Sequence, residues 1–385
     1  MSSKVDSKEE EDEVVFRCDV VPNSVVGDVL RSRKGWREIE PENDSPENFD
    51  FNWTPSKTVK TYFDGFPTSN HHVINHFKNP FELTRKDLMI KNVKRKRRSL
   101  IRLGMKDEAE KFGRICPHSF VLPQDYNLFV EAFKREAPGQ MWIMKPVGRS
   151  QGKGIFLFHS LHQIAGWKRG NDIQNMMSKN EAAEVESYVA QKYIANPHLV
   201  GGKKYDMRIY VLVTSYSPLV AWLYRDGFAR FCISRYSKKR EDMNKIHMHL
   251  TNNAIQKKAD GYGASGVKDC KLPLQSLKLH IASKRGADVA DRVFGDIEDI
   301  IVRSLISVQK AMVQDPNCFE LYVSHEEDIS IYLKRSIFAN THTLTYNTPH
   351  IDTDMTSCST TIFDLGFWKQ ILNPLSVPQV WTIMN

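Results

Sequence analysis

A glycine-rich, basic loop between two apolar segments is the feature that most limits how this chain can fold. Residues 142–146 (W-I-M-K-P) are apolar and β-prone up to a proline, which closes strands because it has no N–H to donate. An arginine and a lysine alternate with the glycines that follow, and residues 155–158 are again apolar; the glycines are Gly148, Gly152 and Gly154. The pattern predicts strand, loop, strand, with backbone N–H groups and cations able to approach a polyphosphate.

Taken alone, the loop fits an ordinary glycine-containing hairpin as well as a phosphate-binding one. It is not a Walker loop, because that motif needs G-x-x-x-x-G-K-[ST] opening a helix. Here Ile155 follows Gly154 and the chain returns to a β pattern. The choice between the two interpretations therefore depends on residues elsewhere in the chain.

The composition indicates a globular protein with an acidic partner. Of the 385 residues, 41% are apolar and 10% aromatic, enough for a buried core in one large domain or in two to three smaller ones. The net charge of +8 suits nucleic acid, an anionic surface or an acidic protein tail. Six cysteines without a C-x-x-C pair argue against a zinc site or a disulfide framework and favour a reducing compartment.

The chain lacks the pattern of a membrane span or a secretion signal. No apolar run approaches about 18 residues. Residues 1–13 are acidic where a signal peptide would be basic and then apolar, and they are expected to form a disordered tail. The sequence therefore predicts a soluble, intracellular protein.

Two clusters of basic or metal-binding residue types need an interpretation. His71, His72 and His76 contain an i,i+4 pair, but no cysteine or carboxylate cluster lies nearby, which favours ordinary half-buried histidines over a metal site. Residues 83–103 predict a helix with Thr84 as N-cap. Its basic run, 94–98, fits a solvated helix face, a surface for an acidic protein, or a nuclear signal or nucleic-acid patch; the absence of interleaved aromatic residues weakens the last.

Alternation along residues 203–214 predicts a strand that carries the candidate charges. Asp206, Arg208 and Tyr210 would lie on one face and apolar residues on the other. The two opposite charges could simply pair, or they could hold a ribose and a carboxylate or phosphate. Residues 219–233 predict a hairpin with Asp226-Gly227 as its turn, and Arg230 would project from its second arm. Other predicted elements are strands at 14–21, 120–122 and 185–194, and helices at 25–33, 126–135 and 287–314.

Eight stretches, in the right order, resemble the tubulin tyrosine ligase-like family and most closely its polyglutamylase branch. They are L-T-R-K-D-L-M-I-K-N (83–92), W-I-M-K-P (142–146), Q-G-K-G-I-F (151–156), V-A-Q-K-Y-I (189–194), K-Y-D-M-R-I-Y-V-L-V-T-S-Y (204–216), W-L-Y-R-D-G-F-A-R-F (222–231), H-L-T-N-N-A-I-Q-K (249–257) and C-F-E-L-Y (318–322). They span residues 80–322 and are too many for a chance match.

The resemblance implies an α+β fold of the ATP-grasp ligase type, built from three subdomains. These would be an N-terminal subdomain at 14–118 with the basic helix 83–103, a central one at 119–200 and a C-terminal one at 201–322. Residues 323–385 would be a divergent tail that leaves the fold incomplete at its C-terminus.

The resemblance also implies which residues hold ATP. They are Lys145, Gln151, Gly152, Gln191, Lys192, Tyr193, Ile194, Lys204, Tyr205, Asp206, Thr251 and Asn252. Lys145 and the glycine-rich loop would contact the phosphates. The backbone of 191–194 would hold adenine, and Lys204 and Asp206 would approach the base and the ribose.

A second group would bind the incoming amino acid and support catalysis. Gln151, Arg230 and Lys271 would bind the substrate glutamate, because a guanidinium meets two carboxylate oxygens with two N–H groups. Arg208 would support the phosphoryl end and, with Lys145, act in catalysis.

The family's chemistry is amide formation. ATP phosphorylates a glutamate γ-carboxylate of the acceptor, and the amine of free L-glutamate attacks the acylphosphate, with ATP and Mg²⁺ as the implied cofactors. The implied partner is tubulin in microtubules, whose acidic C-terminal tails would also account for the basic net charge, with no nucleic acid and no membrane. The implied location is the cytoplasm and cytoskeleton, including the axoneme or basal body of a cilium or flagellum.

After Tyr322 the sequence departs from the family. There the family continues G-[FY]-D and later E-V-N-x-x-P-[SA], whose Asp, Glu and Asn hold magnesium. Here His325 stands where the Asp belongs, and no E-V-N occurs downstream. Mg²⁺ requires hard oxygen ligands in near-octahedral geometry, so histidine is a poor replacement; the carboxylates at 326–328 are the nearby alternative.

Three hypotheses follow from the sequence. The first is a tubulin polyglutamylase, and the second is a catalytically inactive variant without the magnesium ligands that retains ATP or microtubule binding, or that misfolds. The third, a nucleic-acid-binding protein that uses residues 94–98, has no stacking aromatics to support it.

Overall fold

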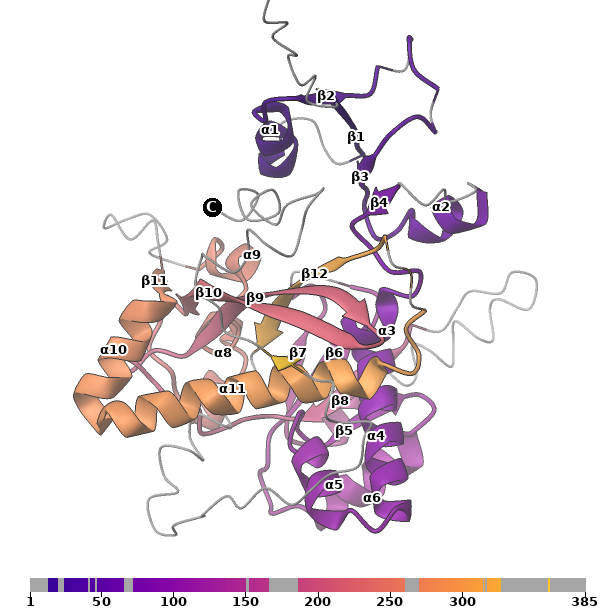
Figure 1. Ribbon diagram of the computed structural model, residues 1–385. Helices are drawn as coiled ribbons and strands as arrows, with labels where there is room; N and C mark the ends of the chain where they lie inside the picture. Colours follow the sequence, from indigo (N-terminus) through magenta and orange to yellow (C-terminus); the bar gives the residue numbers. More distant parts are fainter. Residues whose placement is uncertain are drawn as a thin grey trace, which may run out of the picture.

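The computed structural model describes residues 13–19, 24–40, 42–45, 47–65, 72–149, 152–165, 186–259, 270–313, 315, 317–326 and 359–360, with only the backbone for 323–326 and 359–360. In these residues the strands form three sheets with helices beside them, so the fold is α+β, as predicted (Figure 1). No helix of this part of the chain has both the length and the hydropathy needed to cross a bilayer. The tail predicted at 1–13 lies almost wholly outside the described residues.

The sheet nearest the N-terminus is parallel, with strand order β2-β1-β3-β4. Its strands are β1 (Val14–Cys18), β2 (Trp36–Glu38), β3 (Phe51–Trp53) and β4 (Val73–Ile74), and the helices beside it are α1 (Val25–Arg31) and α2 (Val59–Gly65). The α1 helix begins after a serine cap, because Ser24 Oγ accepts a hydrogen bond from the Gly27 N–H at 3.1 Å. Of the strand predicted at 14–21, the structure has β1 ending at Cys18, and residues 20 and 21 lie outside the described part of the chain.

The second sheet is antiparallel, with order β5-β8-β6-β7. Its strands are β5 (Ser119–Leu122), β6 (Trp142–Pro146), β7 (Phe156–Phe158) and β8 (Tyr188–Lys192), and α6 (Tyr126–Arg135) packs against it. Aromatic rings form the core between helix and sheet, with Trp142 fully buried and edge-to-face on Phe129 at 5.1 Å. The predicted strands and helix here are confirmed, and the glycine-rich loop joins β6 to β7.

The third sheet carries the candidate charges and has order β11-β10-β9-β12. Its strands are β9 (Tyr205–Tyr216), β10 (Leu219–Phe231), β11 (Lys271–Pro273) and β12 (Glu320–Glu326), with β13 (Ser359–Thr360) paired to β10. Two helices, α10 (Leu274–Arg285) and α11 (Ala287–Val308), pack on one face, where they bury Met207, Ile209 and Val211. The predicted alternation is thus confirmed and puts Asp206 and Arg208 on the other face, whereas α11 ends earlier than the predicted 287–314.

The turn predicted at Asp226-Gly227 is wrong. Strand β10 runs unbroken through both residues and pairs with β9, and the connection between the two strands is at 217–218. The pairing register shifts between Leu223 and Gly227, so this part of the strand is a bulge. A Cβ at position 227 would collide with the Arg208 carbonyl oxygen, so glycine allows close approach of two backbones rather than a turn.

The helix predicted at 83–103 is two helices, α3 (Phe81–Thr84) and α4 (Lys86–Arg102). Arg85 between them is extended and is the N-cap position of α4, so Thr84 is not the cap. Its hydroxyl instead donates to the Pro80 carbonyl at 3.0 Å, within α3. The next helix, α5 (Lys106–Gly113), packs against α4.

The basic run on α4 is mainly a solvated face. Arg95, Arg97 and Arg98 are exposed, and Lys94 Nζ lies 3.4 Å from the Asp125 carboxylate. This arrangement fits the first of the interpretations that the sequence left open.

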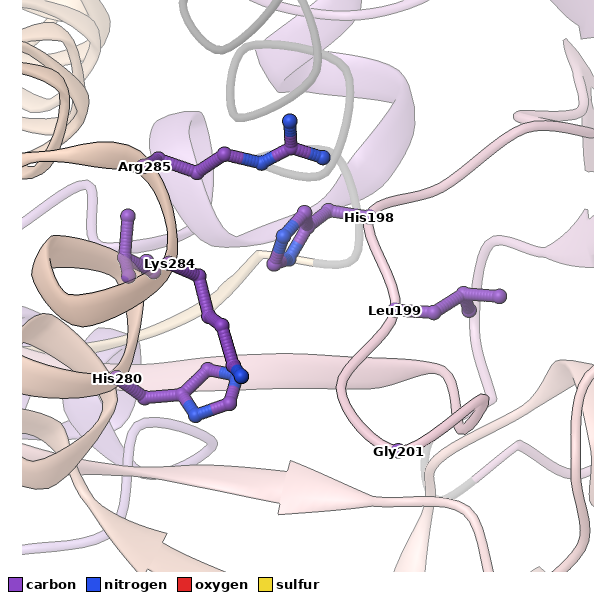
Figure 2. Close-up of a pocket in the computed structure, with 7 residues that line it drawn as sticks. His198, Leu199, Gly201, His280, Lys284 and Arg285 are labelled. Atoms are coloured by element: carbon purple, nitrogen blue, oxygen red, sulfur yellow. The ribbon is translucent and has the colours of Figure 1, made fainter.

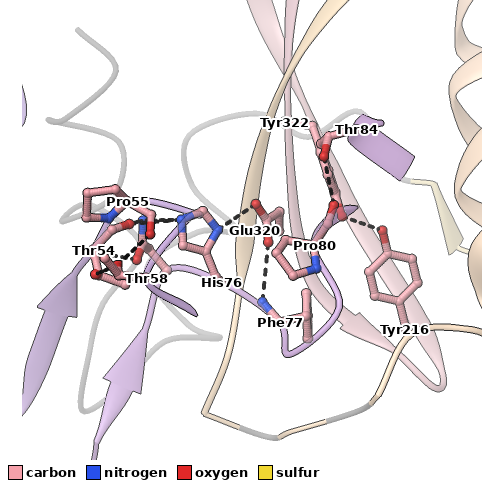
Figure 3. Close-up of polar contacts among 11 residues, drawn as sticks. Thr54, Pro55, Thr58, His76, Phe77, Pro80, Thr84, Tyr216, Glu320 and Tyr322 are labelled. Carbon is pink, nitrogen blue, oxygen red and sulfur yellow. Dashed lines mark hydrogen bonds and ion pairs between the residues drawn. The ribbon is translucent and has the colours of Figure 1, made fainter. Parts of the chain in front are cut away.

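A buried polar joint connects the segment after β4 to β12 (Figure 3). His76 Nδ1 lies 2.7 Å from Glu320 Oε1, and His76 Nε2 lies 2.9 Å from the Thr54 carbonyl oxygen. The other Glu320 oxygen accepts a hydrogen bond from the Phe77 N–H at 3.3 Å. Burial raises the pKa of Glu320, and the hydrogen bond with His76 opposes that shift. The joint therefore holds two distant parts of the chain together through one carboxylate.

The histidines of this region have structural partners. His76 belongs to the joint with Glu320, and His72 is buried with its ring stacked on Phe49 at 4.5 Å, while His71 lies outside the described residues. In the described part of the chain, no three His, Cys, Asp or Glu side chains lie close enough to hold a metal.

Glu320→Ala is expected to lower the free energy of unfolding by about 3 kcal/mol, because it leaves the His76 imidazole and the Phe77 N–H without their acceptor in a buried site. The shift in the urea midpoint measures the loss. Glu320→Gln keeps an amide oxygen within reach of Phe77 and is expected to lose less than the alanine variant. An alanine variant as stable as the parent chain would show that the joint carries no stability.

Candidate active site

The glycine-rich loop lies against the segment that contains Thr251 and Asn252. Gly152 and Gly154 have φ of 77° and 74°, a region that favours glycine. A Cβ on Gly152 would lie 2.6 Å from Ile255 Cδ1 and 2.9 Å from Asn252 Nδ2, so the loop backbone approaches this segment more closely than a side chain would allow. Gln151, which the resemblance implied for ATP and glutamate, lies outside the described residues.

The resemblance implies that this loop holds ATP, and Gly152→Ala is then expected to weaken ATP binding by about 10-fold or more. The new Cβ would push the loop away from Asn252, in addition to a strain of about 1–3 kcal/mol from the positive φ. Gly104→Ala is the matched control, since Gly104 has φ of 78° and its added Cβ would meet nothing within 4 Å. ATP affinity and thermal stability of both variants are compared with the parent. Equal ATP affinity in the two variants would contradict the close approach.

Lys145 is held by a chain of hydrogen bonds across the second sheet. Its Nζ donates to Gln191 Oε1 at 2.8 Å, and Gln191 Nε2 donates to Ser119 Oγ at 2.9 Å. The Ser119 hydroxyl in turn donates to the Pro117 carbonyl at 2.6 Å. This series of hydrogen bonds fixes which end of the Gln191 amide faces Lys145. The bond to Gln191 therefore orients the Lys145 ammonium.

The segment predicted to hold adenine, residues 191–194, uses some of its hydrogen-bonding groups within the protein. The backbone N–H groups of Lys192 and Tyr193 donate to the carbonyls of His118 and Met141, at 2.9 and 3.0 Å, which removes them as donors to a base. The Lys192 side chain turns to α6 and pairs with Glu136 at 2.7 Å. An adenine contact from these two residues would therefore use carbonyl groups.

Lys204 is buried in a small polar cluster with Tyr193 and His249. Its Nζ donates to the His249 carbonyl at 2.8 Å and lies 5.0 Å from the centre of the Tyr193 ring. His249 ends α8 (Ile246–His249); its Nε2 faces the Asp242 carbonyl at 3.1 Å, so Nδ1 accepts from the Tyr193 hydroxyl at 3.1 Å. Burial lowers the pKa of His249, and the neighbouring charge of Lys204 adds to that effect.

Asp206 pairs with an arginine on the neighbouring strand. Arg230 donates to both carboxylate oxygens, with Nε–Oδ1 at 3.0 Å and Nη2–Oδ2 at 2.6 Å. Arg208 Nη2 lies 3.6 Å from Asp206 Oδ2, and the three side chains are 1–14% exposed. Of the two possibilities that the sequence left open, pairing therefore holds, with Arg230 as the closer partner.

Lys271 extends this group of charges by one strand. In the strand register, Asp206 is opposite Arg230, and Arg230 is opposite Lys271. The ammonium of Lys271 lies 5.1 Å from the centre of the Phe228 ring, and the residue is exposed. Because this group contains three cations, Arg208, Arg230 and Lys271, and one carboxylate, its net charge is positive and suits a ligand with carboxylate or phosphate groups.

Thr251 contributes a buried hydroxyl that needs a partner. The residue is fully buried, and among the described residues its Oγ1 has no hydrogen-bond partner. A buried hydroxyl left unsatisfied costs about 1–3 kcal/mol, so its position beside Asn252 and Gly152 fits a ligand oxygen or nitrogen at this point. Asn252 is the N-cap position of α9 (Asn253–Gln256), where its side chain makes no capping bond.

The structure places the predicted residues in separate small groups and directs two side chains elsewhere. Gly152 lies against Asn252. Two residues before Thr251, the His249 carbonyl accepts a hydrogen bond from Lys204. Tyr205 is the exception on β9, because its hydroxyl bonds His198 Nδ1 at 2.9 Å on the helix-covered face of the sheet. Lys192, with its bond to α6, is the other.

The sequence did not identify the partners that hold these residues. Gln256 was within a quoted motif, yet its role depends on the fold: its Oε1 accepts from the Ile233 N–H at 2.8 Å, and its Nε2 donates to the His247 carbonyl at 2.9 Å. These bonds fasten the loop before α9 to the end of β10. A buried glutamine beside an apolar residue gives no signal of this in the sequence.

The described residues do not provide a magnesium site. No group of three potential ligands occurs among them, and the Asp206 carboxylate is already shared by two arginines. Position 325 lies in β12 in register with Arg208, which puts it beside the candidate charges. The histidine there occupies the place where the resemblance expects an aspartate.

Comparison with known proteins gives a family match and several relatives. A model described as "Tubulin-tyrosine ligase family" matches residues 66–325. The match ends close to Tyr322, after which the family's expected segments are absent from the sequence.

The relatives share most of the chain. A protein of Bos taurus named "Probable tubulin polyglutamylase TTLL9" is 42% identical over 338 residues, covering 82% of this chain and 71% of the relative. "Probable tubulin polyglutamylase ttll-9" of Caenorhabditis elegans is 40% identical over 309 residues, which is 80% of this chain and 69% of the relative. "Probable alpha-tubulin polyglutamylase Ttll1" of Tetrahymena thermophila is 42% identical over 301 residues, 75% of this chain and 70% of the relative.

Proposed function

Because this chain belongs to the tubulin-tyrosine ligase family, we propose that it is a tubulin polyglutamylase-type ligase that uses ATP to add glutamate to glutamate side chains of tubulin tails. The names of its relatives and the α+β fold support this, and the fold would be of the ATP-grasp type. Its N-terminal, central and C-terminal subdomains would follow the boundaries expected from the sequence. The substrate would place the protein on the cytoskeleton, including ciliary microtubules.

The contact between the glycine-rich loop and the Thr251 segment carries the nucleotide part of this proposal. The loop backbone comes so close to Asn252 that a Cβ on Gly152 would collide with it, and Thr251 supplies a buried hydroxyl without a described partner. Backbone N–H groups of the loop would face the phosphates. Lys145, oriented by Gln191, would neutralise charge on the phosphates, and the Lys204 cluster would lie near the base. These features fit ATP, which would provide the phosphoryl group for activating the acceptor.

The charged row across β9, β10 and β11 carries the amino-acid part. Asp206 uses Nε and one N–H of Nη2 of Arg230, and this leaves the remaining guanidinium N–H groups for a carboxylate of free glutamate. Lys271, in register with Arg230, would bind the second carboxylate. Two cations for two carboxylates favour glutamate over glycine or tyrosine as the amino acid that is added.

The reaction would proceed in two balanced steps. The acceptor γ-carboxylate oxygen attacks the γ-phosphorus of ATP, and ADP leaves with the electron pair of the broken P–O bond. The amine of glutamate then attacks the acyl carbon of the acylphosphate, loses a proton and expels inorganic phosphate, which leaves the new amide. Arg208 and Lys145 would stabilise the charge on the transferred group, and the row around Arg230 would position the amine.

A second candidate function follows from the sequence after Tyr322. The chain would then bind ATP or microtubules without efficient catalysis, because the residues that the structure describes do not fit Mg²⁺ and the family's E-V-N is absent from the sequence. For the same reason, neither step of the proposed reaction is assigned to a metal. The observation that favours this candidate is His325 at a position in register with Arg208.

One assay separates the two candidates. The purified chain is incubated with ATP, radiolabelled glutamate and microtubules, with tubulin lacking its acidic tails as control. Incorporation that requires both ATP and the tails supports the ligase. ATP binding without incorporation supports the inactive variant, and incorporation of glycine or tyrosine in place of glutamate would contradict the proposed donor.

A further inference from the structure

An ion pair closes the base of the glycine-rich loop. Arg149, in the first limb of the loop, faces Glu186 with Nε–Oε1 at 2.5 Å and Nη2–Oε2 at 2.9 Å, so that the guanidinium meets both carboxylate oxygens. The Tyr188 hydroxyl donates to Glu186 Oε2 at 3.3 Å, which ties the carboxylate to the start of β8. Glu186 lies outside the stretches that resemble the family, and the pairing of Arg149 depends on the fold.

This ion pair lies on the opposite side of the second sheet from Lys145. Tyr188 packs in the aromatic core beneath α6. Gln191, three residues later on the same strand, points to the other face and binds Lys145 there. Because Glu186 is bonded to the Tyr188 hydroxyl, the Arg149 guanidinium lies behind the loop and not on the face where the phosphates are proposed to bind.

The guanidinium also joins the two limbs of the loop. A Cβ on Gly154, in the second limb, would lie 3.5 Å from Arg149 Nη1 and 3.3 Å from Pro146 Cγ, so the two limbs are in close contact at this point. The first limb is held from α4 as well, since Lys86 Nζ donates to the carbonyls of Pro146 and Arg149 at 3.2 and 3.1 Å. Side chains from α4 and from the start of β8 thus fix the base of the loop, while its tip lies against the Asn252 segment.

We propose that Arg149 and Glu186 are positioning residues, whose ion pair is a clasp that holds the glycine-rich loop in the shape that binds the ATP phosphates. The guanidinium acts through the loop backbone and does not itself contact the nucleotide. The two side chains are 52% and 35% exposed, and exposed pairs contribute little to the stability of a fold. The effect of the clasp is therefore expected in ATP affinity and not in the urea midpoint. The inference rests on the proposed function, because that function supplies the nucleotide.

The test exchanges the two charges. Arg149→Glu and Glu186→Arg are each expected to weaken ATP binding about 10-fold, because each sets two like charges against one another at the base of the loop. The double exchange, Arg149→Glu/Glu186→Arg, restores an ion pair at the same place and should bring ATP affinity back to within about 3-fold of the parent value. Adenosine, which has no phosphates, should bind all three variants as it binds the parent chain. Calorimetry measures ATP affinity, and NMR titration measures adenosine affinity.

Two controls separate the clasp from net charge. Arg31 and Glu38 form a comparable pair beside the N-terminal sheet, with Nε–Oε2 at 2.7 Å and side chains 43% and 36% exposed, so Arg31→Glu breaks a matched pair that belongs to other elements. Lys284→Glu makes the same charge change at the cavity of about 340 Å³ that the loop after β8 and the last turns of α10 form (Figure 2). Both controls should bind ATP with the parent affinity.

Single clasp variants that bind ATP as tightly as the two controls would overturn the proposal. A double exchange that binds ATP as weakly as Arg149→Glu would also overturn it, because Arg149 would then act through its own charge on the phosphates. So would equal losses of ATP and adenosine affinity, which indicate a general disturbance of the site. Failure of the proposed function would look different, since the parent chain itself would not bind ATP.

Discussion

Replacing residues 323–385 by the corresponding C-terminal segment of a polyglutamylase relative is expected to raise the rate of glutamate incorporation by about 10³-fold or more. The segment would restore the family's carboxylate and amide oxygens, which suit Mg²⁺ and which His325 does not replace. Loss of a single group that stabilises transition-state charge lowers kcat by about 10²–10³-fold, and several such groups are absent from this sequence. The parent chain and the chimera are compared for incorporation of radiolabelled glutamate into microtubules at equal protein concentration.

The structure makes Tyr322 a suitable junction for this chimera. Strand β12 pairs with β9 in continuous register from Glu320 to position 326, and Tyr322 is buried, with its hydroxyl 2.9 Å from that of Tyr216. A graft that begins at position 323 therefore extends a strand that is already in place. ATP affinity should be similar in both proteins, because the glycine-rich loop and Thr251 are unchanged.

The control is the same chimera with the restored aspartate of the G-[FY]-D segment changed to alanine. We expect it to bind ATP and to lose most of the gained rate. Incorporation of glutamate by the parent chain as fast as by the chimera would exclude the inactive variant. Residues 323–385 would then supply the catalytic groups that the family pattern indicates they lack.

Local patterns in the sequence were sufficient where the structure depends on local chemistry. The glycines of the loop predicted a bend between two strands, and alternation along 203–214 predicted which β9 residues meet the helices. Local patterns failed at Gly227, where an Asp-Gly pair has a strong turn signal but the deciding factor is the Arg208 carbonyl on the neighbouring strand. They failed again at Thr84, since the break at Arg85 gives α4 a different start.

The candidate site shows the same division. Resemblance named Lys145, Arg230 and Asp206, but it did not predict that Gln191 would orient the lysine or that the arginine would pair with the aspartate. Those pairings depend on the register between strands, which is set by the whole sheet and by the bulge near Gly227. Sequence alone therefore identified candidate residues, and the fold was needed to find their partners.

Asp206→Ala is expected to lower the free energy of unfolding by about 3–5 kcal/mol, which is a severe effect for a single substitution. The carboxylate is buried between Arg230 and Arg208, and its alanine replacement removes the negative charge that both guanidinium groups face. Such a loss is a large share of the roughly 5–15 kcal/mol typical of folded domains, so the variant should have a much lower urea midpoint and reduced soluble yield.

Asp206→Leu/Arg230→Met is the control that separates stability from function. It replaces the closer buried pair by apolar side chains of similar size, and such replacements are often neutral or stabilising. The part of the loss that comes from Arg230 should therefore return, whereas Arg208 still lacks the Asp206 carboxylate. Binding of free glutamate, measured by calorimetry, should not return, because the guanidinium proposed to hold its carboxylate is absent. Glutamate binding by the double variant with the parent affinity would remove Arg230 from the proposed site, and an Asp206→Ala variant with the parent urea midpoint would show that the ion pair does not stabilise the fold.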